Sequence, residues 1–292
     1  MVMRTDPIRS YYIRRNAELL EKLKKYKPPR QHFVASQLGM CRLALWFEQS
    51  GYLPSVKTAR DDDYGNDGDM HHDAVRRFMQ SIGLKIDDVK FREDGTVEET
   101  GVYVLDLKHK GKKFRISMRL DGKVKTGTVR RTLEIKSIGY WKLKPIADVW
   151  TNTESETAVL AWLLQNRKDI IYQVHANMVA TGLKSTYLVI KSRSECYTGL
   201  HSSKNPDSIL GGIVVPFSDN VWQGILNKLA FVQKHLDSKT EPEPDFIEPS
   251  KECDYCKYQH LCHGAAKREK KGLSPARLHP QLGTILHADQ LR

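Results

Sequence analysis

The 292-residue sequence has no hydrophobic run approaching the roughly 20 residues that a membrane-spanning helix needs. The segment Met1–Arg15 also has no apolar core of the kind that signal peptides carry. These absences argue against a membrane-spanning helix. We therefore expect a cytoplasmic protein that does not bind membranes.

Cysteine is scarce as well. The chain has five, an odd number, and without an export signal this argues against a framework of structural disulfides.

Internal repeats and low-complexity tracts are absent. Hydrophobic residues make up 40% of the chain and charged residues 28%, which is typical of a globular protein rather than a disordered or collagen-like one.

Acidic residues are outnumbered by basic ones. The chain has 47 Lys and Arg against 35 Asp and Glu, a net charge of +12 that favours a polyanionic partner such as nucleic acid. Ten of these surplus charges are at the two ends, +6 in residues 1–30 and +4 in residues 264–292. Residues 106–131 carry ten basic side chains against two acidic ones. Both ends are expected to form basic arms.

The spacing of apolar residues changes along the chain from helical to β-like. In chain order it predicts helices at 9–26, 36–49 and 70–82, with an acidic loop at 61–69, then strands at 102–107, 114–120 and 132–137, two helices within 155–182, strands at 186–191 and 212–216, and a helix at 219–236. Turn signals between the first three strands indicate an antiparallel meander. This order predicts an α/β fold with a central mixed β-sheet flanked by helices, a helical N-terminal region and a C-terminal cysteine cluster.

Three short motifs bring potential metal ligands to this expected sheet. In Glu134-Ile135-Lys136, the carboxylate and the ammonium are two residues apart in a strand and point to the same side. Asp121 ends the preceding expected strand, and His72 is on the third helix. Each motif alone also fits an ordinary ion pair, turn aspartate or surface histidine. Together, two carboxylates, the backbone carbonyl of Ile135 and an imidazole favour Mg²⁺ or Mn²⁺.

In their order along the chain, these motifs resemble the PD-(D/E)xK nuclease superfamily, and within it the RecB-like branch. Members of that branch have a helix with G-x(2-3)-H, a strand ending in G/R-x-D-G, a strand with E-x-K and a helix with Q-x3-Y. The match covers about residues 30–263. His72, Asp121, Glu134 and Lys136 correspond to the first three motifs.

The fourth motif matches in part. Gln173 corresponds to its glutamine, whereas Asn177 stands where the family has tyrosine. His71 is the alternative to His72 in the first motif, and the continuation His72-Asp73-Ala74-Val75 favours His72.

The resemblance implies a restriction-endonuclease-like core and a Mg²⁺- or Mn²⁺-dependent deoxyribonuclease. Asp121 and Glu134 would hold the cation, with His72 and the carbonyl of Ile135 as further ligands. Lys136 would position or deprotonate the attacking water, and Gln173 would orient the lysine or the DNA backbone.

Relatives of this architecture often act as exonucleases on single-stranded or open DNA ends in recombination, replication, repair or CRISPR adaptation. The resemblance therefore also indicates DNA and a recombination or replication protein as partners. The alternative is a catalytically inactive DNA-binding or scaffolding module of the same fold, which the departure at Asn177 favours.

Three of the cysteines, Cys253, Cys256 and Cys262, form a C-x2-C-x5-C cluster, a spacing that indicates a metal. Iron–sulfur members of the RecB-like branch carry one early cysteine and three at the C-terminal end, which makes Cys41 the expected fourth ligand of a 4Fe-4S cluster. Zinc is the alternative, with His260 or His263 as the fourth ligand. Cys196 has no metal spacing.

The chain is accordingly expected to have three parts. Residues 1–30 form a basic helical arm, residues 31–263 a RecB-like nuclease domain closed by the cysteine cluster, and residues 264–292 a basic tail.

Overall fold

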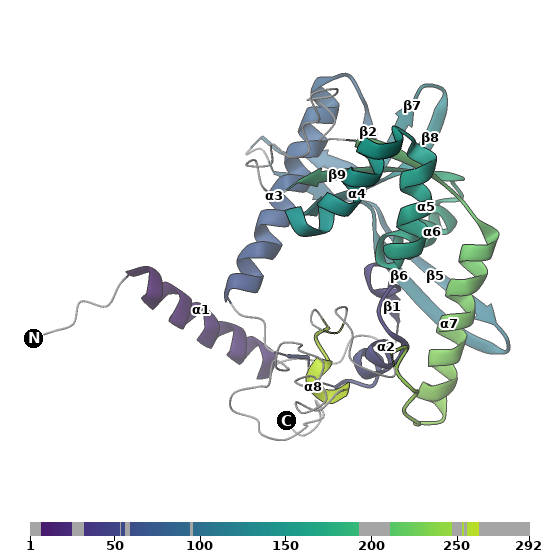
Figure 1. Ribbon diagram of the computed structural model, residues 1–292. Helices are drawn as coiled ribbons and strands as arrows, with labels where there is room; N and C mark the ends of the chain where they lie inside the picture. Colours follow the sequence, from purple (N-terminus) through teal and green to yellow (C-terminus); the bar gives the residue numbers. More distant parts are fainter. Residues whose placement is uncertain are drawn as a thin grey trace, which may run out of the picture.

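The computed structural model describes residues 7–24, 32–52, 54–55, 59–93, 96–192, 211–246, 253 and 256–262. In these ranges helices flank mixed β-sheets, which confirms the predicted α/β fold (Figure 1). Across the same ranges, every helix is too short or too polar to cross a membrane.

The central sheet has five strands in the order β10-β9-β8-β7-β2. The strands are β2 (Ile86–Asp87), β7 (Gly122–Thr126), β8 (Val129–Ile138), β9 (Ser185–Ser192) and β10 (Gly211–Pro216). β8 and β9 run parallel and the other neighbours antiparallel, so the sheet is mixed. β8 is the middle strand and its residues 132–135 are buried, which places Glu134-Ile135-Lys136 in the protein interior.

A second sheet has the order β1-β6-β5, and a separate hairpin pairs β3 with β4. The strands are β1 (Phe33–Val34), β3 (Val89–Phe91), β4 (Val97–Glu99), β5 (Val102–His109) and β6 (Lys112–Arg119). The turn between β5 and β6 has φ angles of 47° at Lys110 and 76° at Gly111, the left-handed conformation of tight hairpins. It confirms the predicted turn.

The predicted meander is wrong at its second connection. β6 and β7 belong to different sheets. β7 follows β6 in the chain, and β8 pairs with β7 and not with β6. The chain passes from one sheet to the other at Asp121-Gly122, where Gly122 has a φ of 144°. A Cβ at Gly122 would lie 2.5 Å from the side chain of Ile86, so this crossing needs glycine. Asp121 therefore stands where the two sheets diverge and not in an ordinary turn.

The helices are α1 (Pro7–Lys24), α2 (Arg42–Gln49), α3 (Ala59–Ser81), α4 (Tyr140–Thr153), α5 (Glu156–Asn166), α6 (Lys168–Thr181), α7 (Asp219–Asp237) and α8 (Gln259–Cys262), with a 3-10 turn at Ala35–Gln37. α4 was not predicted, and two boundaries differ strongly from expectation. The acidic stretch 61–69 is helical and not a loop, since acidic residues near a helix start interact favourably with its dipole. α2 begins at Arg42, with Cys41 as its N-cap residue.

Helices cover both faces of the central sheet. On one face, Val75 and Met79 of α3 pack with Leu133 and Ile135 of β8. On the other face, α4, α5 and α6 pack with β9 and β10 around Leu163, Val174 and Leu188, among others. Since residues alternate along a strand, Glu134 and Lys136 face α6 while their neighbours face α3. α1 extends away from these layers (Figure 1).

Candidate active site

Asp121, which lies between the two sheets, is hydrogen-bonded to the Glu134-Ile135-Lys136 segment. Its carboxylate Oδ2 accepts a hydrogen bond from the backbone N–H of Ile135 at 2.6 Å. This N–H belongs to the residue between Glu134 and Lys136. The N–H and C=O groups of one strand residue point to the same side, so the Ile135 carbonyl also faces Asp121. The hydrogen bond brings the aspartate into contact with the E-x-K segment, from which it is separate in sequence.

Glu134 and Lys136 make an ion pair that α6 holds in place. Lys136 Nζ lies 2.6 Å from Glu134 Oε1 and donates a hydrogen bond to Gln173 Oε1 at 2.8 Å. The side chain of Glu134 is 1% exposed and that of Lys136 is 22% exposed. The amine can therefore reach a ligand while the carboxylate stays shielded from bulk water.

Asn177 occupies the position one helical turn after Gln173 and contacts the same ion pair. Its Nδ2 donates to Glu134 Oε2 at 3.0 Å, and its side chain is fully buried. The residue that departs from the Q-x3-Y pattern is thus a direct partner of Glu134. The i, i+4 spacing after Gln173, which places both side chains on one helix face, is the signal that predicts this contact.

We expect Asn177→Leu to weaken Mn²⁺ binding about 10- to 100-fold, the usual cost of losing a hydrogen bond to a ligating carboxylate. The leucine has a similar size but leaves Glu134 Oε2 without its donor. Mn²⁺ titration by calorimetry measures the change.

Thr186→Val is the matched control for this substitution, because Thr186 is also fully buried and hydrogen-bonded, to Thr132 at 2.6 Å. It should leave Mn²⁺ affinity unchanged. Equal affinities for wild type and Asn177→Leu would contradict a role for Asn177 at the site.

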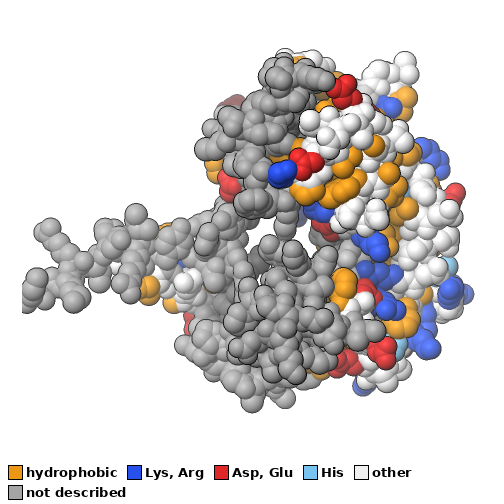
Figure 2. All heavy atoms as spheres, viewed as in Figure 1, with side chains coloured by type: hydrophobic (Ala, Val, Ile, Leu, Met, Phe, Trp, Pro, Cys, Tyr) orange, Lys and Arg blue, Asp and Glu red, His pale blue; other side chains and the backbone are white. Residues whose placement is uncertain are grey.

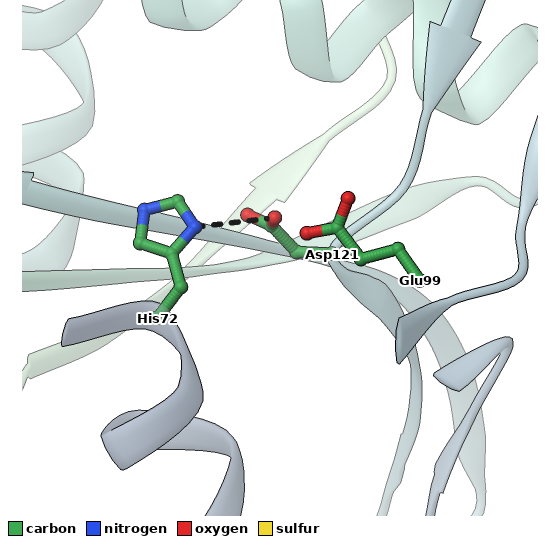
Figure 3. Close-up of side chains that lie close together, drawn as sticks. All are labelled: His72, Glu99 and Asp121. Carbon is green, nitrogen blue, oxygen red and sulfur yellow. Dashed lines mark ion pairs between the residues drawn. The ribbon is translucent and has the colours of Figure 1, made fainter. Parts of the chain in front are cut away.

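Of the two adjacent histidines, His72 reaches Asp121. Its Nδ1 lies 3.4 Å from Asp121 Oδ1 (Figure 3), whereas His71 pairs with Asp67 on its own helix at 3.5 Å. Both His72 and Asp121 are partly buried. His72 is therefore the histidine in contact with Asp121, and its role as a metal ligand stays a prediction.

Glu99, which the sequence motifs do not include, points toward the same group. One ligand atom each from His72, Glu99 and Asp121 lie within 4.8 Å of one another (Figure 3), and no other three His, Cys, Asp or Glu side chains in the described ranges do so. Glu134 is outside this compact group. Glu99 ends the three-residue strand β4, which carries no motif, so sequence reasoning had no signal for it.

The charges around Asp121 influence each other. Burial opposes ionisation of Asp121, but the hydrogen bond and charge of His72 and the charge of Arg76 lower its pKa to about 2. Burial raises the pKa of Glu134 to about 7, and the negative charge of Asp121 adds to this effect while Lys136 opposes it. At neutral pH Asp121 is thus ionised, whereas burial keeps a large share of Glu134 protonated despite the nearby Lys136.

A cavity of about 460 Å³ opens beside this group. Its walls include His72 and Glu99, together with Arg92 and Arg119. Arg119 belongs to the basic stretch 106–131 and is 66% exposed. Other members of that stretch are paired elsewhere, such as Lys112 with Asp237 at 2.6 Å. Figure 2 shows Lys and Arg side chains along the side of the molecule that carries β5, β6 and α7.

The four cysteines of the expected cluster gather at the other end of the molecule. Burial, together with the nearby Cys41, Cys253 and Cys256, raises the pKa of the Cys262 thiol to about 12. Backbone N–H groups of Asp245 and Tyr258 donate to the sulfurs of Cys41 (3.2 Å) and Cys256 (3.4 Å). Cys41 and the three C-terminal cysteines therefore lie close together. The side chain of His260, and His263 and Cys196 as a whole, lie outside the described residues.

Direct contacts also join the two segments that carry these cysteines. α2 and α8 lie side by side (Figure 1), and between them the buried Tyr258 donates from its hydroxyl to Glu48 Oε2 at 2.6 Å. The N–H of Ser55 donates to the carbonyl of Lys257 at 2.7 Å. Segments about 210 residues apart in sequence are thus packed together.

The loop before Cys41 is anchored to two further helices. Lys228 of α7 donates to the carbonyl oxygens of Leu38, at 3.0 Å, and Met40. A Cβ at Gly39 would lie 2.3 Å from the backbone of Asp169, in the first turn of α6. α6 also carries Gln173 and Asn177, so the cysteine region and the Glu134–Lys136 pair share one supporting helix.

Comparisons with known proteins give a likeness of fold. No protein-family model matches the chain, and no curated protein matches it. A structure described as the crystal structure of SSO0001 aligns over 88% of this chain and 96% of its own, with 12% identity and a TM-score of 0.46. The alkaline exonuclease LHK-Exo from Laribacter hongkongensis aligns over 75% and 93%, with 13% identity and a TM-score of 0.41. Its complex with dAMP aligns over 79% and 93%, with 14% identity and a TM-score of 0.39. At these identities and TM-scores the likenesses carry no conclusion about what this chain does.

Proposed function

We propose that the protein is a Mg²⁺- or Mn²⁺-dependent deoxyribonuclease of the PD-(D/E)xK type, acting as an exonuclease on single-stranded or open DNA ends. The observation that carries this proposal is the hydrogen bond between Asp121 and the backbone of Ile135, which joins the aspartate to the Glu134–Lys136 pair. The nuclease domain comprises residues 31–263, with basic segments before and after it that would contact DNA phosphates.

The chemistry of the donor atoms suits such a cation, although Glu134 lies outside the compact group of His72, Glu99 and Asp121. Asp121 and Glu134 supply carboxylate oxygens, Ile135 a carbonyl oxygen and His72 an imidazole nitrogen, a set that suits Mg²⁺ or Mn²⁺. Glu134 is almost completely buried with a raised pKa, which a bound divalent cation would counteract. When bound, the cation neutralises phosphate charge and lowers the pKa of an attacking water.

Each side chain has a separate task at this site. Lys136 is the partly exposed amine, so it orients the water and the scissile phosphate. Gln173 accepts a hydrogen bond from Lys136 and fixes the direction of the amine. Asn177 holds the second oxygen of Glu134. Arg119, on the wall of the cavity, is placed to bind a neighbouring phosphate.

A cleavage assay tests the proposal. Purified protein is incubated with end-labelled linear single-stranded DNA, linear duplex DNA and circular single-stranded DNA, with Mn²⁺ or with EDTA. We expect mononucleotide or short products from linear DNA, no cleavage of circles and no activity in EDTA. Binding without cleavage at any metal concentration would favour the inactive DNA-binding module, and cleavage of circles would show an endonuclease.

We further propose that Cys41, Cys253, Cys256 and Cys262 hold a 4Fe-4S cluster with a structural role. An iron–sulfur cluster is held by four thiolates. Cys41, Cys253, Cys256 and Cys262 are close enough to one another to influence the pKa of Cys262, which supports a shared cofactor.

A further inference from the structure

Arg76 is a buried cation directly beside the proposed metal site. It lies on α3 one helical turn after His72, its side chain is 2% exposed, and it is the largest of the fully buried side chains that the structure describes. Burying a guanidinium is costly unless it is well paired.

The contacts of Arg76 all lead to the carboxylates around the cavity. Its Nη2 lies 2.5 Å from Glu99 Oε1 and 2.9 Å from Asp121 Oδ1. Its Nη1 lies 3.1 Å from Asp73 Oδ1, and its Nε donates to the backbone oxygen of Asp121 at 3.0 Å. One nitrogen thus bridges two carboxylates, one from β4 and one from the connection between β6 and β7.

These two carboxylates belong to the compact group of His72, Glu99 and Asp121. One imidazole nitrogen and two carboxylate oxygens so close together are the donors of a divalent cation site. Many nucleases use two metal ions about 3.5–4 Å apart. The guanidinium nitrogen stands between Glu99 and Asp121, in the space where a cation shared by them would lie.

We propose that Arg76 takes the place of a second divalent cation, so that this site binds one metal ion and Glu99 is the partner of Arg76 and not a metal ligand. This inference rests on the proposed metal site. Arginine stays charged at every accessible pH, so it is a permanent substitute that needs no metal. Removing its charge leaves Glu99 free to bind a second ion, with the carboxylate of Asp121 shared between the two ions.

Mn²⁺ stoichiometry, which requires no DNA and no activity, tests the proposal. Calorimetric titration should give one Mn²⁺ per chain for wild type, two for Arg76→Gln and one for the double variant Arg76→Gln, Glu99→Gln. Two Mn²⁺ ions about 3.5–4 Å apart are magnetically coupled, so the electron paramagnetic resonance spectrum of Arg76→Gln should show coupling that is missing in wild type.

Glu99→Gln in the wild-type background is a second test, because it keeps the contacts of Arg76 with Asp73 and Asp121 even if Arg76→Gln fails to fold. We expect one Mn²⁺ per chain with an affinity within about threefold of wild type, whereas losing even a hydrogen-bond partner of a true ligand costs about 10- to 100-fold and losing the ligand itself costs more. That larger loss would overturn the inference, as would two Mn²⁺ in wild type or one in folded Arg76→Gln. Wild type that binds no Mn²⁺ would instead refute the proposed metal site itself.

Discussion

Asp121→Asn should reduce Mn²⁺-dependent cleavage of linear DNA by about three orders of magnitude, because a metal ion contributes several kcal/mol to transition-state stabilisation and about 1.4 kcal/mol corresponds to tenfold. Asparagine keeps the shape of the side chain but removes the charge that His72 and Arg76 stabilise. Single-turnover cleavage of end-labelled DNA at saturating Mn²⁺ measures the effect. A rate within tenfold of wild type would contradict the role of Asp121.

Asp88→Asn is the matched control. Asp88 is also a paired carboxylate, 2.9 Å from Lys123 Nζ and accepting from the Tyr103 hydroxyl at 2.8 Å. Its φ of 65° is left-handed, a conformation that asparagine tolerates. This control should cleave DNA at the wild-type rate. A similar loss in both variants would indicate general damage to the fold.

Cys41→Ser is expected to cause the largest loss of stability. It should remove the iron and the brown colour, and lower the free energy of unfolding by up to about 5 kcal/mol, the value for releasing a cross-link that closes a loop of about 210 residues. Serine is a favourable N-cap residue, so α2 keeps its start and the thiolate alone is lost. Iron content per chain and urea denaturation measure the two effects.

Cys196→Ser is the control for this variant, because Cys196 lies apart from the C-x2-C-x5-C spacing. It should keep its iron and its stability. Full iron content in Cys41→Ser would rule out Cys41 as a ligand. Colourless wild-type protein that contains zinc would refute the iron–sulfur cluster.

Much of the fold was predictable because the relevant signals are local. Turn residues marked the β5–β6 hairpin, and the helices α5, α6 and α7 have clear helical spacing. The change of sheet at Asp121-Gly122 was not predictable, because the same two residues are typical of a hairpin turn. What distinguishes them is the approach of Ile86 to Gly122, a contact between distant segments.

At the candidate site, too, some residues were predictable from local motifs and others were not. Asp121, Glu134 and Lys136 are in short motifs, and their mutual contacts agree with the pattern. Glu99 and Arg76 are not in any motif, and their importance comes from a contact across 23 positions in sequence. A sequence motif identifies residues that act on a shared ligand. It does not identify the partners that neutralise them.

The position of a Mn²⁺ ion is the most direct test of the central claim, that Asp121, Glu134, Ile135 and His72 surround one cation. Crystals grown with Mn²⁺ and measured at the manganese absorption edge should show one anomalous peak, about 2.1–2.2 Å from the carboxylate oxygens of Asp121 and Glu134 and from the carbonyl of Ile135. A peak that contacts neither carboxylate, or the absence of any peak at millimolar Mn²⁺, would contradict the account.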